Sequence, residues 1–309
     1  EKVPNDEIEC NSGKRWFITH HAVYHKVKQK LRIVFNCSLN YGGVSLNSKL
    51  LQGPDLMNNL LGVLLRFRNG EIAVMADIEK MFYQVKVPPE HRNFLRFLWF
   101  DRNDLTSEPV QYRLTVHVFG AISSPSCSNY ALKKTAYDNE NDFDQDTKKT
   151  ILQQFYVDDM LCSMDDANEA ALRLKNVMAL CEKGGFNLTQ VVSNSPIVLK
   201  SISTEKVAKS LKEQEIGAFD NSTERALGVV RNLEKDVFKF NIQLKNEPLT
   251  KRGILSTLFS IYDPFGFAGP ALLPGKLIFQ TLFLLYVQQS NLHKNLLMLS
   301  ILFALSKIL

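Results

Sequence analysis

Two apolar runs of this sequence end in carboxylates, and this pattern constrains the fold more than any other feature. Val74-Met75-Ala76 leads into Asp77, and Phe155-Tyr156-Val157 leads into Asp158-Asp159. An ionised carboxylate beside an apolar core is costly unless it is paired or bound to a metal ion. Several carboxylates together also repel one another, which raises a pKa unless a divalent cation neutralises them. The pattern therefore predicts two strands whose acidic ends form one site.

The Asp158-Asp159 pair needs a turn in the chain. Successive side chains on a strand point to opposite faces, so two adjacent aspartates share a role only where the strand ends. A hairpin tip meets this requirement, with Asp158 in the site and Asp159 turned to its edge. Oxygen ligands of this kind favour Mg²⁺. The alternative is that both strands end in surface turns, where Asp is common.

The remaining pattern predicts a mixed α+β fold without regular βαβ units. Period-two and continuous apolar runs predict strands, and apolar residues at helical spacing predict helices. The expected strands are 32–35, 72–76, 85–87, 93–100, 110–119 and 155–164, with a hairpin formed by 227–230 and 237–242. The expected helices are 56–65, entered at Pro54-Asp55, then 167–181, ended by Gly184-Gly185, and the region from Thr250 onwards.

Composition narrows the class of protein. The 309 residues are 45% hydrophobic and 22% charged, which is ordinary for a globular chain of about two domains. The net charge of +5 is compatible with a polyanionic partner but does not argue for one. Five cysteines without a C-x-x-C pair disfavour a disulfide framework and a zinc knuckle. Residues 1–6 lack the apolar core of a signal peptide, and residues 296–305 are expected to form a terminal helix too short to span a membrane.

The wording of both carboxylate motifs resembles reverse transcriptases. Tyr156-Val157-Asp158-Asp159 is their Y-x-D-D box, and residues 76–85 resemble their first aspartate motif. More closely, the chain resembles the reverse transcriptase of Pao/BEL-type LTR retrotransposons over about residues 14–285. The phrases that carry this resemblance are His20-His21-Ala22-Val23, Lys30-Leu31-Arg32-Ile33-Val34-Phe35, Gly53-Pro54, Asp77-Ile78-Glu79-Lys80-Met81, Phe155-Tyr156-Val157-Asp158-Asp159, Gly184-Gly185-Phe186 and Thr250-Lys251-Arg252-Gly253-Ile254-Leu255-Ser256.

The resemblance implies a right-hand polymerase with fingers, palm and a partial thumb, in which an antiparallel palm sheet packs on helices. It implies fingers in residues 1–70 and 86–119, and a palm in residues 71–85 and 120–242. Residues 243–309 would form a thumb-like helical region with an atypical or truncated tail.

The resemblance also implies a two-metal site for RNA-directed DNA synthesis. Asp77 and Asp158 would be the main ligands of Mg²⁺ or Mn²⁺, with Asp159 adjacent and the backbone carbonyl of Ile78 as a further ligand. The metal ions would activate the primer 3′-hydroxyl and stabilise the pyrophosphate leaving group. The implied partners are an RNA or DNA template with its primer and deoxynucleoside triphosphates. A stable membrane partner and the other polyprotein domains are not expected, and the expected location is cytoplasmic, in a virus-like particle.

Further residues would bind the substrates if the resemblance holds. Arg32 would lie over the incoming triphosphate, with Lys30 as a weaker contact, and Phe82 would exclude ribonucleotides by a clash with the 2′-hydroxyl. The alternative for the last role is that Phe82 belongs to the core and Tyr83 faces the sugar. The complete substrate-binding set is Lys30, Arg32, Lys80, Met81, Phe82, Gly120 and Tyr156.

Some positions depart from the family pattern. Asn36 stands where these enzymes usually have Asp, and Gln190 replaces a lysine that can protonate the pyrophosphate. These departures leave a second hypothesis open: a degenerate, non-catalytic retroelement fragment that keeps the fold and nucleic-acid binding. A third, a Mg²⁺ phosphohydrolase, would need another carboxylate or His near Asp77 and Asp158.

Overall fold

The acidic motifs lie in the first of two units into which the chain divides, residues 1–216 and 217–309, in the computed structural model. The structure describes residues 1–9, 13–25, 29–208, 223–226, 229–232, 237–239, 248, 250–261 and 263–288. The boundary at 216/217 falls inside the range assigned above to the palm. The assignment of fingers, palm and thumb therefore stays a prediction.

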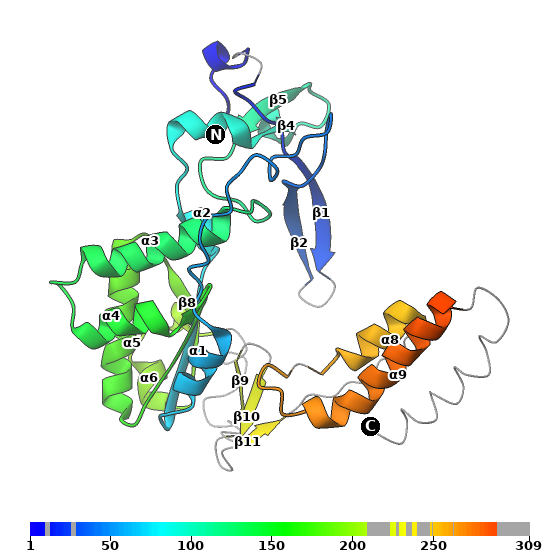
Figure 1. The fold of residues 1–309 in the computed structure, drawn as a ribbon. Helices are drawn as coiled ribbons and strands as arrows, with labels where there is room; N and C mark the ends of the chain where they lie inside the picture. The colour runs from blue at the N-terminus through cyan, green and yellow to red at the C-terminus, as the bar shows by residue number, and fades with distance from the viewer. Residues whose placement is uncertain are drawn as a thin grey trace. The chain divides into compact units, whose positions relative to one another are not determined.

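The secondary structure of the first unit confirms a mixed α+β chain (Figure 1). Its strands are β1 (Thr19–His25), β2 (Lys30–Asn36), β3 (Ile72–Ile78), β4 (Arg96–Phe100), β5 (Pro109–Arg113), β6 (Phe155–Tyr156), β7 (Asp159–Met164) and β8 (Leu188–Ser193). Its α-helices are α1 (Leu60–Phe67), α2 (Met81–Gln84), α3 (Ser124–Asp138), α4 (Gln145–Gln153), α5 (Ala167–Lys183) and α6 (Pro196–Lys200). Its 3₁₀ turns are η1 (Asn5–Glu7), η2 (Pro89–Leu95), η3 (Asp101–Asn103) and η4 (Thr204–Lys206).

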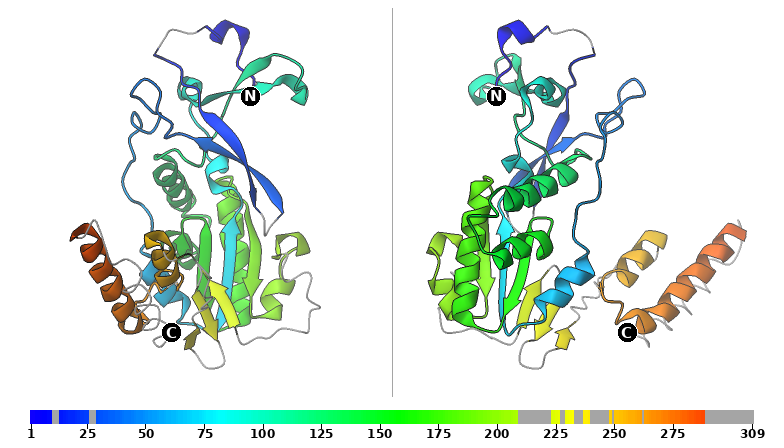
Figure 2. Two further views of the ribbon diagram at one scale, coloured as in Figure 1. Left: turned by 90° about the vertical axis from the view of Figure 1, so that its right-hand side faces the viewer. Right: turned by 60° about the vertical axis from the view of Figure 1, so that its left-hand side comes forward.

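A four-stranded antiparallel sheet of order β6-β7-β3-β8 forms the centre of this unit. Helices α3, α4 and α5 lie on one side of it and α1 lies on the other (Figure 2). The alternation of side chains decides which residues each side receives. Val74, Ala76 and Ile78 of β3 belong to the main apolar core with the helices. Asp77 consequently lies on the opposite face of the strand.

Helix α1 lies on that opposite face, where it contacts β7 and β6. Its backbone carbonyl at Arg66 accepts a hydrogen bond from Ser163, near the end of β7 that is remote from Asp159. Buried Val63, Leu64 and Phe67 form the inner side of α1. At the other end, Asn58, which precedes the helix, donates a hydrogen bond to the Phe155 carbonyl of β6 at 2.8 Å.

Two further hairpins complete the first unit. Strands β1 and β2 pair over their full lengths, and β4 pairs with β5. A second apolar cluster joins the base of the β1–β2 hairpin to the segments that follow β3 and β5. Its buried members are Ile18, Cys37, Leu46, Val87, Leu95, Val118 and Ala121.

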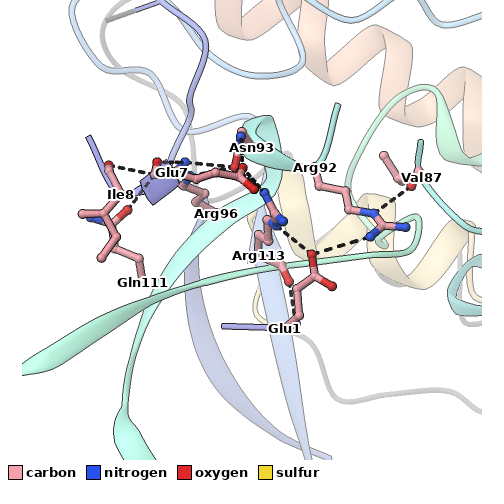
Figure 3. Close-up of polar contacts among 9 residues, drawn as sticks. All are labelled: Glu1, Glu7, Ile8, Val87, Arg92, Asn93, Arg96, Gln111 and Arg113. Atoms are coloured by element: carbon pink, nitrogen blue, oxygen red, sulfur yellow. Dashed lines mark hydrogen bonds and ion pairs between the residues drawn. The ribbon is translucent and has the colours of Figure 1, made fainter. Parts of the chain in front are cut away.

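Two buried arginines anchor the N-terminal segment on the β4–β5 hairpin (Figure 3). The Arg96 side chain is fully buried and donates to the backbone carbonyls of Glu7 and Ile8 at 2.7 and 3.1 Å. It also donates to the side-chain oxygens of Asn93 and Gln111. Arg113 pairs with the carboxylates of Glu1 and Glu7. Charged groups at this depth are stable because each is paired and hydrogen-bonded.

The second unit is described in part. Strands β9 (Thr223–Ala226), β10 (Val229–Asn232) and β11 (Val237–Lys239) form an antiparallel sheet in the order β11-β10-β9. Helices α8 (Lys251–Leu258) and α9 (Gly269–Gln288) pack against each other. The predicted hairpin is confirmed as β10–β11, and β9 is an additional strand that the sequence pattern did not show.

Helix α1 differs from its prediction at the N-terminus. The helix begins at Leu60, with Asn59 as its N-cap, and not at Pro54-Asp55. The Asn59 side chain accepts a hydrogen bond from the Gly62 amide at 3.1 Å, which satisfies an otherwise unpaired donor of the first turn. The predicted strand 93–100 is likewise shorter, because residues 89–95 form a 3₁₀ turn before β4. The predicted strand 110–119 is also shorter, since β5 ends at Arg113.

No helix among the described residues combines the length and apolar character needed to cross a bilayer. The apolar tail at 296–305 lies outside the described residues.

Substitution of Arg96 tests the buried anchor. We expect Arg96→Met to lower the free energy of unfolding by about 3–5 kcal/mol, because the hydrogen bonds that the buried guanidinium donates to Glu7, Ile8, Asn93 and Gln111 are lost. Lys2→Met is the control, since it breaks an exposed pair with Asp101 that contributes only about 0–1 kcal/mol. Chemical denaturation of both variants measures the difference. Equal losses would show that the arginine network does not hold the segment.

The N-cap of α4 predicts a pH dependence. Burial by itself raises the pKa of Asp144. The hydrogen bonds from Thr147, the positive charge of Arg173 and the hydrogen bond from Asn176 together outweigh this effect and lower the pKa to about 2. Because the pKa of Asp144 is lower in the folded state, its ionised carboxylate stabilises the fold at pH values above 3.8, the pKa in the unfolded chain. This contribution disappears as the pH falls from about 4 to 2. Denaturation of Asp144→Asn between pH 5 and 2.5 should show a shallower loss of stability than the wild type, and identical slopes would contradict the assignment.

Candidate active site

Asp77 and Asp159 lie next to each other on the adjacent strands β3 and β7 of the central sheet. They are direct cross-strand partners in the antiparallel register of β3 and β7. Directly opposed residues project from the same face of a sheet. Strand alternation was expected to turn Asp159 away from the site, and the register shows the reverse. The expectation was wrong because Asp158 lies in the turn and not on the strand, so alternation does not relate the two aspartates.

The turn itself is strained. Tyr156 pairs with Asp159, which leaves Val157 and Asp158 as the two turn residues. Val157 has φ = 57°, a left-handed conformation that a β-branched residue rarely adopts. The Asp158 carbonyl accepts a hydrogen bond from the Ile78 amide at 2.9 Å. This bond ties the turn to the end of β3, one residue beyond Asp77.

The three carboxylates share one electrostatic environment. Burial raises the pKa of Asp159 to about 6, and the negative charges of Asp158 and Asp77 contribute to the rise. Burial also raises the pKa of Asp158, and a backbone hydrogen bond offsets this only in part. The site is therefore destabilised by its own charge unless a proton or a cation is bound.

Other strained residues flank the same aspartates. Lys80, three positions after Asp77, has φ = 49°, and Gln190 has φ = 53°. Gln190 lies in a bulge of β8, where the register shifts between the partners of Met75 and Asp77. Strained backbone and bulges concentrate at functional sites because the surrounding structure holds them in place. The position of the missing lysine is thus occupied by an exposed Gln in a bulge beside Asp77.

The donor set suits a hard divalent cation. Among the described residues, no group of three or more His, Cys, Asp or Glu side chains is arranged to hold a metal ion by itself. Magnesium commonly uses only one or two carboxylates, with water and substrate phosphates as its other ligands. The carboxylates of Asp77, Asp158 and Asp159 fit this mode of binding. A role for the Ile78 carbonyl stays a prediction.

Phe82 belongs to the main apolar core and lies at the border between that core and the exposed Phe119. Its ring is 8% exposed and its centroid is 4.4 Å from that of Phe119, which is 46% exposed. Met81 is buried, so its side chain is a core group. Tyr83 packs on the second apolar cluster, and burial raises the pKa of its hydroxyl.

Gly120 makes a close approach that only glycine permits. Its φ is 104°, and a Cβ there would lie 2.8 Å from the carbonyl oxygen of Phe35 at the end of β2. The predicted approach to nucleotide and template stays untested. The structure adds a second reason for glycine, since this loop rests on the β1–β2 hairpin.

The remaining predicted residues lie on exposed or partly buried surfaces. Lys30 and Arg32 are exposed on one face of β2, opposite His25 and Val23. The Lys80 ammonium lies 3.7 Å from the Glu79 carboxylate. Tyr156 is partly buried beside Asp159. Their contacts with substrate stay predictions.

Two residues of this region were missed by the sequence analysis. Phe119 was not singled out, although its ring covers Phe82. Asn47 was not singled out either, and its side chain bonds to the Gly120 loop. No local motif marks an asparagine whose partners in this loop, Gly120 and Ile122, lie more than 70 positions away, so the sequence carried no signal for Asn47.

Comparison with known families gives one partial match. Residues 250–297 match the model of the Pao retrotransposon-like RNaseH-like domain. This match lies within residues 243–309, for which the resemblance to reverse transcriptases implies a thumb-like helical region. No curated protein sequence gives a significant match.

Comparison with solved structures shows the fold. The chain is similar to a foamy viral protease-reverse transcriptase in complex with double-stranded DNA, with 15% identity and a TM-score of 0.58. This match covers 94% of the present chain and 44% of the viral one. A foamy viral protease-reverse transcriptase in complex with an RNA/DNA hybrid gives 15% identity and a TM-score of 0.56, with 95% and 34% coverage.

The chain thus spans less than half of the length of these two viral chains. The mixed α+β fold with small antiparallel sheets matches theirs. Together, the family match and the shared fold support a fragment of a retroelement polyprotein.

Proposed function

We propose that this chain is the polymerase part of a retroelement polyprotein, a reverse transcriptase that adds deoxynucleotides to a primer. The observation that carries the proposal is the register of β3 and β7, which sets Asp77 opposite Asp159 with Asp158 in the adjoining turn. An acidic cluster at a strained hairpin is suited to bind divalent cations and, through them, phosphates.

The proposed chemistry is phosphoryl transfer. Asp77 and Asp158 would hold Mg²⁺ or Mn²⁺, with Asp159 as a further carboxylate. The bound cations would supply charge neutralisation for the triphosphate and a lower pKa for the primer 3′-hydroxyl. The chain itself fixes the carboxylates. The Ile78–Asp158 hydrogen bond and the left-handed Val157 hold the turn so that little reorganisation is needed when substrate binds.

The proposed partners are an RNA or DNA template with primer and deoxynucleoside triphosphates. The foamy viral structures of similar fold were determined with double-stranded DNA or an RNA/DNA hybrid, which supports a nucleic-acid substrate for this chain. Such a substrate would be held mainly through its phosphates, without reading of the sequence.

A non-catalytic relic is the second candidate, and the bulge of β8 favours it. An exposed Gln190 replaces the lysine expected there, so no cationic side chain is available at that position to protonate pyrophosphate. Primer extension on a homopolymer template with Mg²⁺ or Mn²⁺ separates the two functions. Extension supports the polymerase, whereas binding of primer–template without extension supports the relic.

Substitution of the three aspartates tests the site. Asp77→Asn, Asp158→Asn and Asp159→Asn should each reduce nucleotide incorporation by roughly 100-fold or more, because each removes charge from the cation site. Without metal, each variant should be at least as stable as the wild type, since like-charge repulsion is relieved. Primer extension and thermal melting with and without Mg²⁺ measure both effects.

Asp165→Asn is the matched control, because this exposed carboxylate follows the opposite end of β7. It should leave incorporation and the Mg²⁺-dependent melting shift unchanged. Normal incorporation by Asp159→Asn alone would place Asp159 outside the cation site. Normal incorporation by all three variants would reject the polymerase.

Substitution of Phe82 tests the selection of the sugar. Phe82→Val should raise ribonucleotide use relative to deoxynucleotide use, because the clash with the 2′-hydroxyl is removed. It should also lower stability, since the ring is part of the core. Incorporation of both sugars by Phe82→Val and Tyr83→Val gives the comparison. A change of selectivity in Tyr83→Val with none in Phe82→Val would assign the sugar contact to Tyr83.

A further inference from the structure

The side chain of Asn47 makes three hydrogen bonds, to two segments of the chain. Its amide nitrogen donates to the Gly120 carbonyl at 2.8 Å and to the Ser38 hydroxyl at 2.9 Å. Its oxygen accepts from the Ile122 amide at 3.0 Å. The Asn47 backbone amide also donates to the Cys37 carbonyl at 3.0 Å. One residue therefore connects the end of β2 with both sides of the loop at Ala121.

The same loop is held at two other points. Gly120 lies so near the Phe35 carbonyl that a Cβ at this position would be 2.8 Å from its oxygen, so no other residue fits there. The Ser124 hydroxyl donates to the Val118 carbonyl at 2.8 Å from the start of α3. Phe119 is thus the exposed residue of a short loop whose backbone is fixed before and after it.

Phe119 in turn contacts the helix that follows the first acidic strand. Its ring contacts Phe82 at 4.4 Å and Tyr83 at 5.9 Å between centroids. Both partners follow Asp77 within six residues, so the loop touches the segment that leaves the acidic strand. A shift of the loop would move Phe119 relative to Phe82 and to the carboxylates.

We propose that Asn47 is a positioning residue for the nucleotide pocket, and this inference rests on the proposed polymerase function. Asn47 joins the Gly120 loop to the end of β2. It thereby fixes the position of the Phe119–Phe82 pair relative to β2, the strand that carries Arg32. Asn47 acts through the loop and touches no reacting atom. Its loss should therefore affect the binding of the incoming nucleotide more than the chemical step.

Two variants separate the donor role of Asn47 from its shape. Asn47→Ala removes all three side-chain bonds. Asn47→Asp keeps the shape and the acceptor for the Ile122 amide, but it places a carboxylate oxygen against the Gly120 carbonyl. If shape alone matters, Asn47→Asp behaves as wild type; if the donor matters, it behaves as Asn47→Ala.

Asn194→Ala is the matched control. The Asn194 side chain also bridges two backbone groups, by donating to the Glu71 carbonyl at 2.8 Å and accepting from the Ala73 amide at 2.9 Å. These groups lie at the end of β3 remote from Asp77. Its loss should lower the melting temperature by a similar amount without reaching the nucleotide pocket.

Steady-state primer extension and hydrogen exchange of residues 118–123 test the proposal on the whole chain. We expect both Asn47 variants to raise the KM for deoxynucleotide roughly tenfold, the effect of about one lost hydrogen bond, with kcat changed less. Exchange of the loop amides should accelerate in Asn47→Ala and stay normal in Asn194→Ala. An unchanged KM in both Asn47 variants, or an equal rise in Asn194→Ala, would overturn the proposal.

Failure of the polymerase function would have a different signature. A wild type without incorporation rejects the proposed function, whatever the Asn47 variants do. Hydrogen exchange still decides the positioning role in that case, because it requires no activity. Normal protection of the Ile122 amide in Asn47→Ala would show that Asn47 does not hold the loop.

Discussion

The cross-strand pairing of Asp77 with Asp159 is the constraint on which the candidate site depends. Two carboxylates directly opposed in a sheet repel each other. Burial is the main cause of the raised pKa of Asp159, and the charges of Asp158 and Asp77 add to it. The pairing persists because the other face of the same strands is buried against α3 and α5, where Ala76 and Met160 belong to the core. Apolar burial on one face thus offsets electrostatic repulsion on the other.

Three residues near these aspartates have strained backbone conformations. Val157, Lys80 and Gln190 all adopt left-handed conformations within the segments that surround the acidic end of the sheet. Such conformations each cost on the order of 1–3 kcal/mol and persist only where packing holds them. Within the same unit, the buried Arg96 fixes the N-terminal segment to the β4–β5 hairpin. The site is therefore one strained part of this unit, and η3, with left-handed Arg102 and Asn103, is another.

Local pattern predicted some elements and missed others. The predicted strand 85–87 is only an isolated bridge at Lys86, and helices α3 and α4 were not predicted. The apolar run before Asp77 and the amphipathic spacing of 167–181 gave β3 and α5 because burial periodicity is encoded locally. Helix α1 began later than expected, since Asn59 supplies the cap and competing turn residues precede it. The predicted alternation at Asp158-Asp159 failed for a similar reason. The turn consists of Val157 and Asp158, so strand β7 begins at Asp159 and not at Asp158. Asp159 therefore lies on the sheet face opposite to the one that was expected.

The sequence by itself determined that acidic groups follow two apolar strands, which chemistry such groups favour, and where helix α5 lies. These properties depend on neighbours in the chain. Only the tertiary structure decided that Asp159 opposes Asp77, that Phe119 covers Phe82, and that Asn47 joins the Gly120 loop to β2. Register and hydrogen bonds between distant segments arise from packing of the whole unit, so no local pattern encodes them.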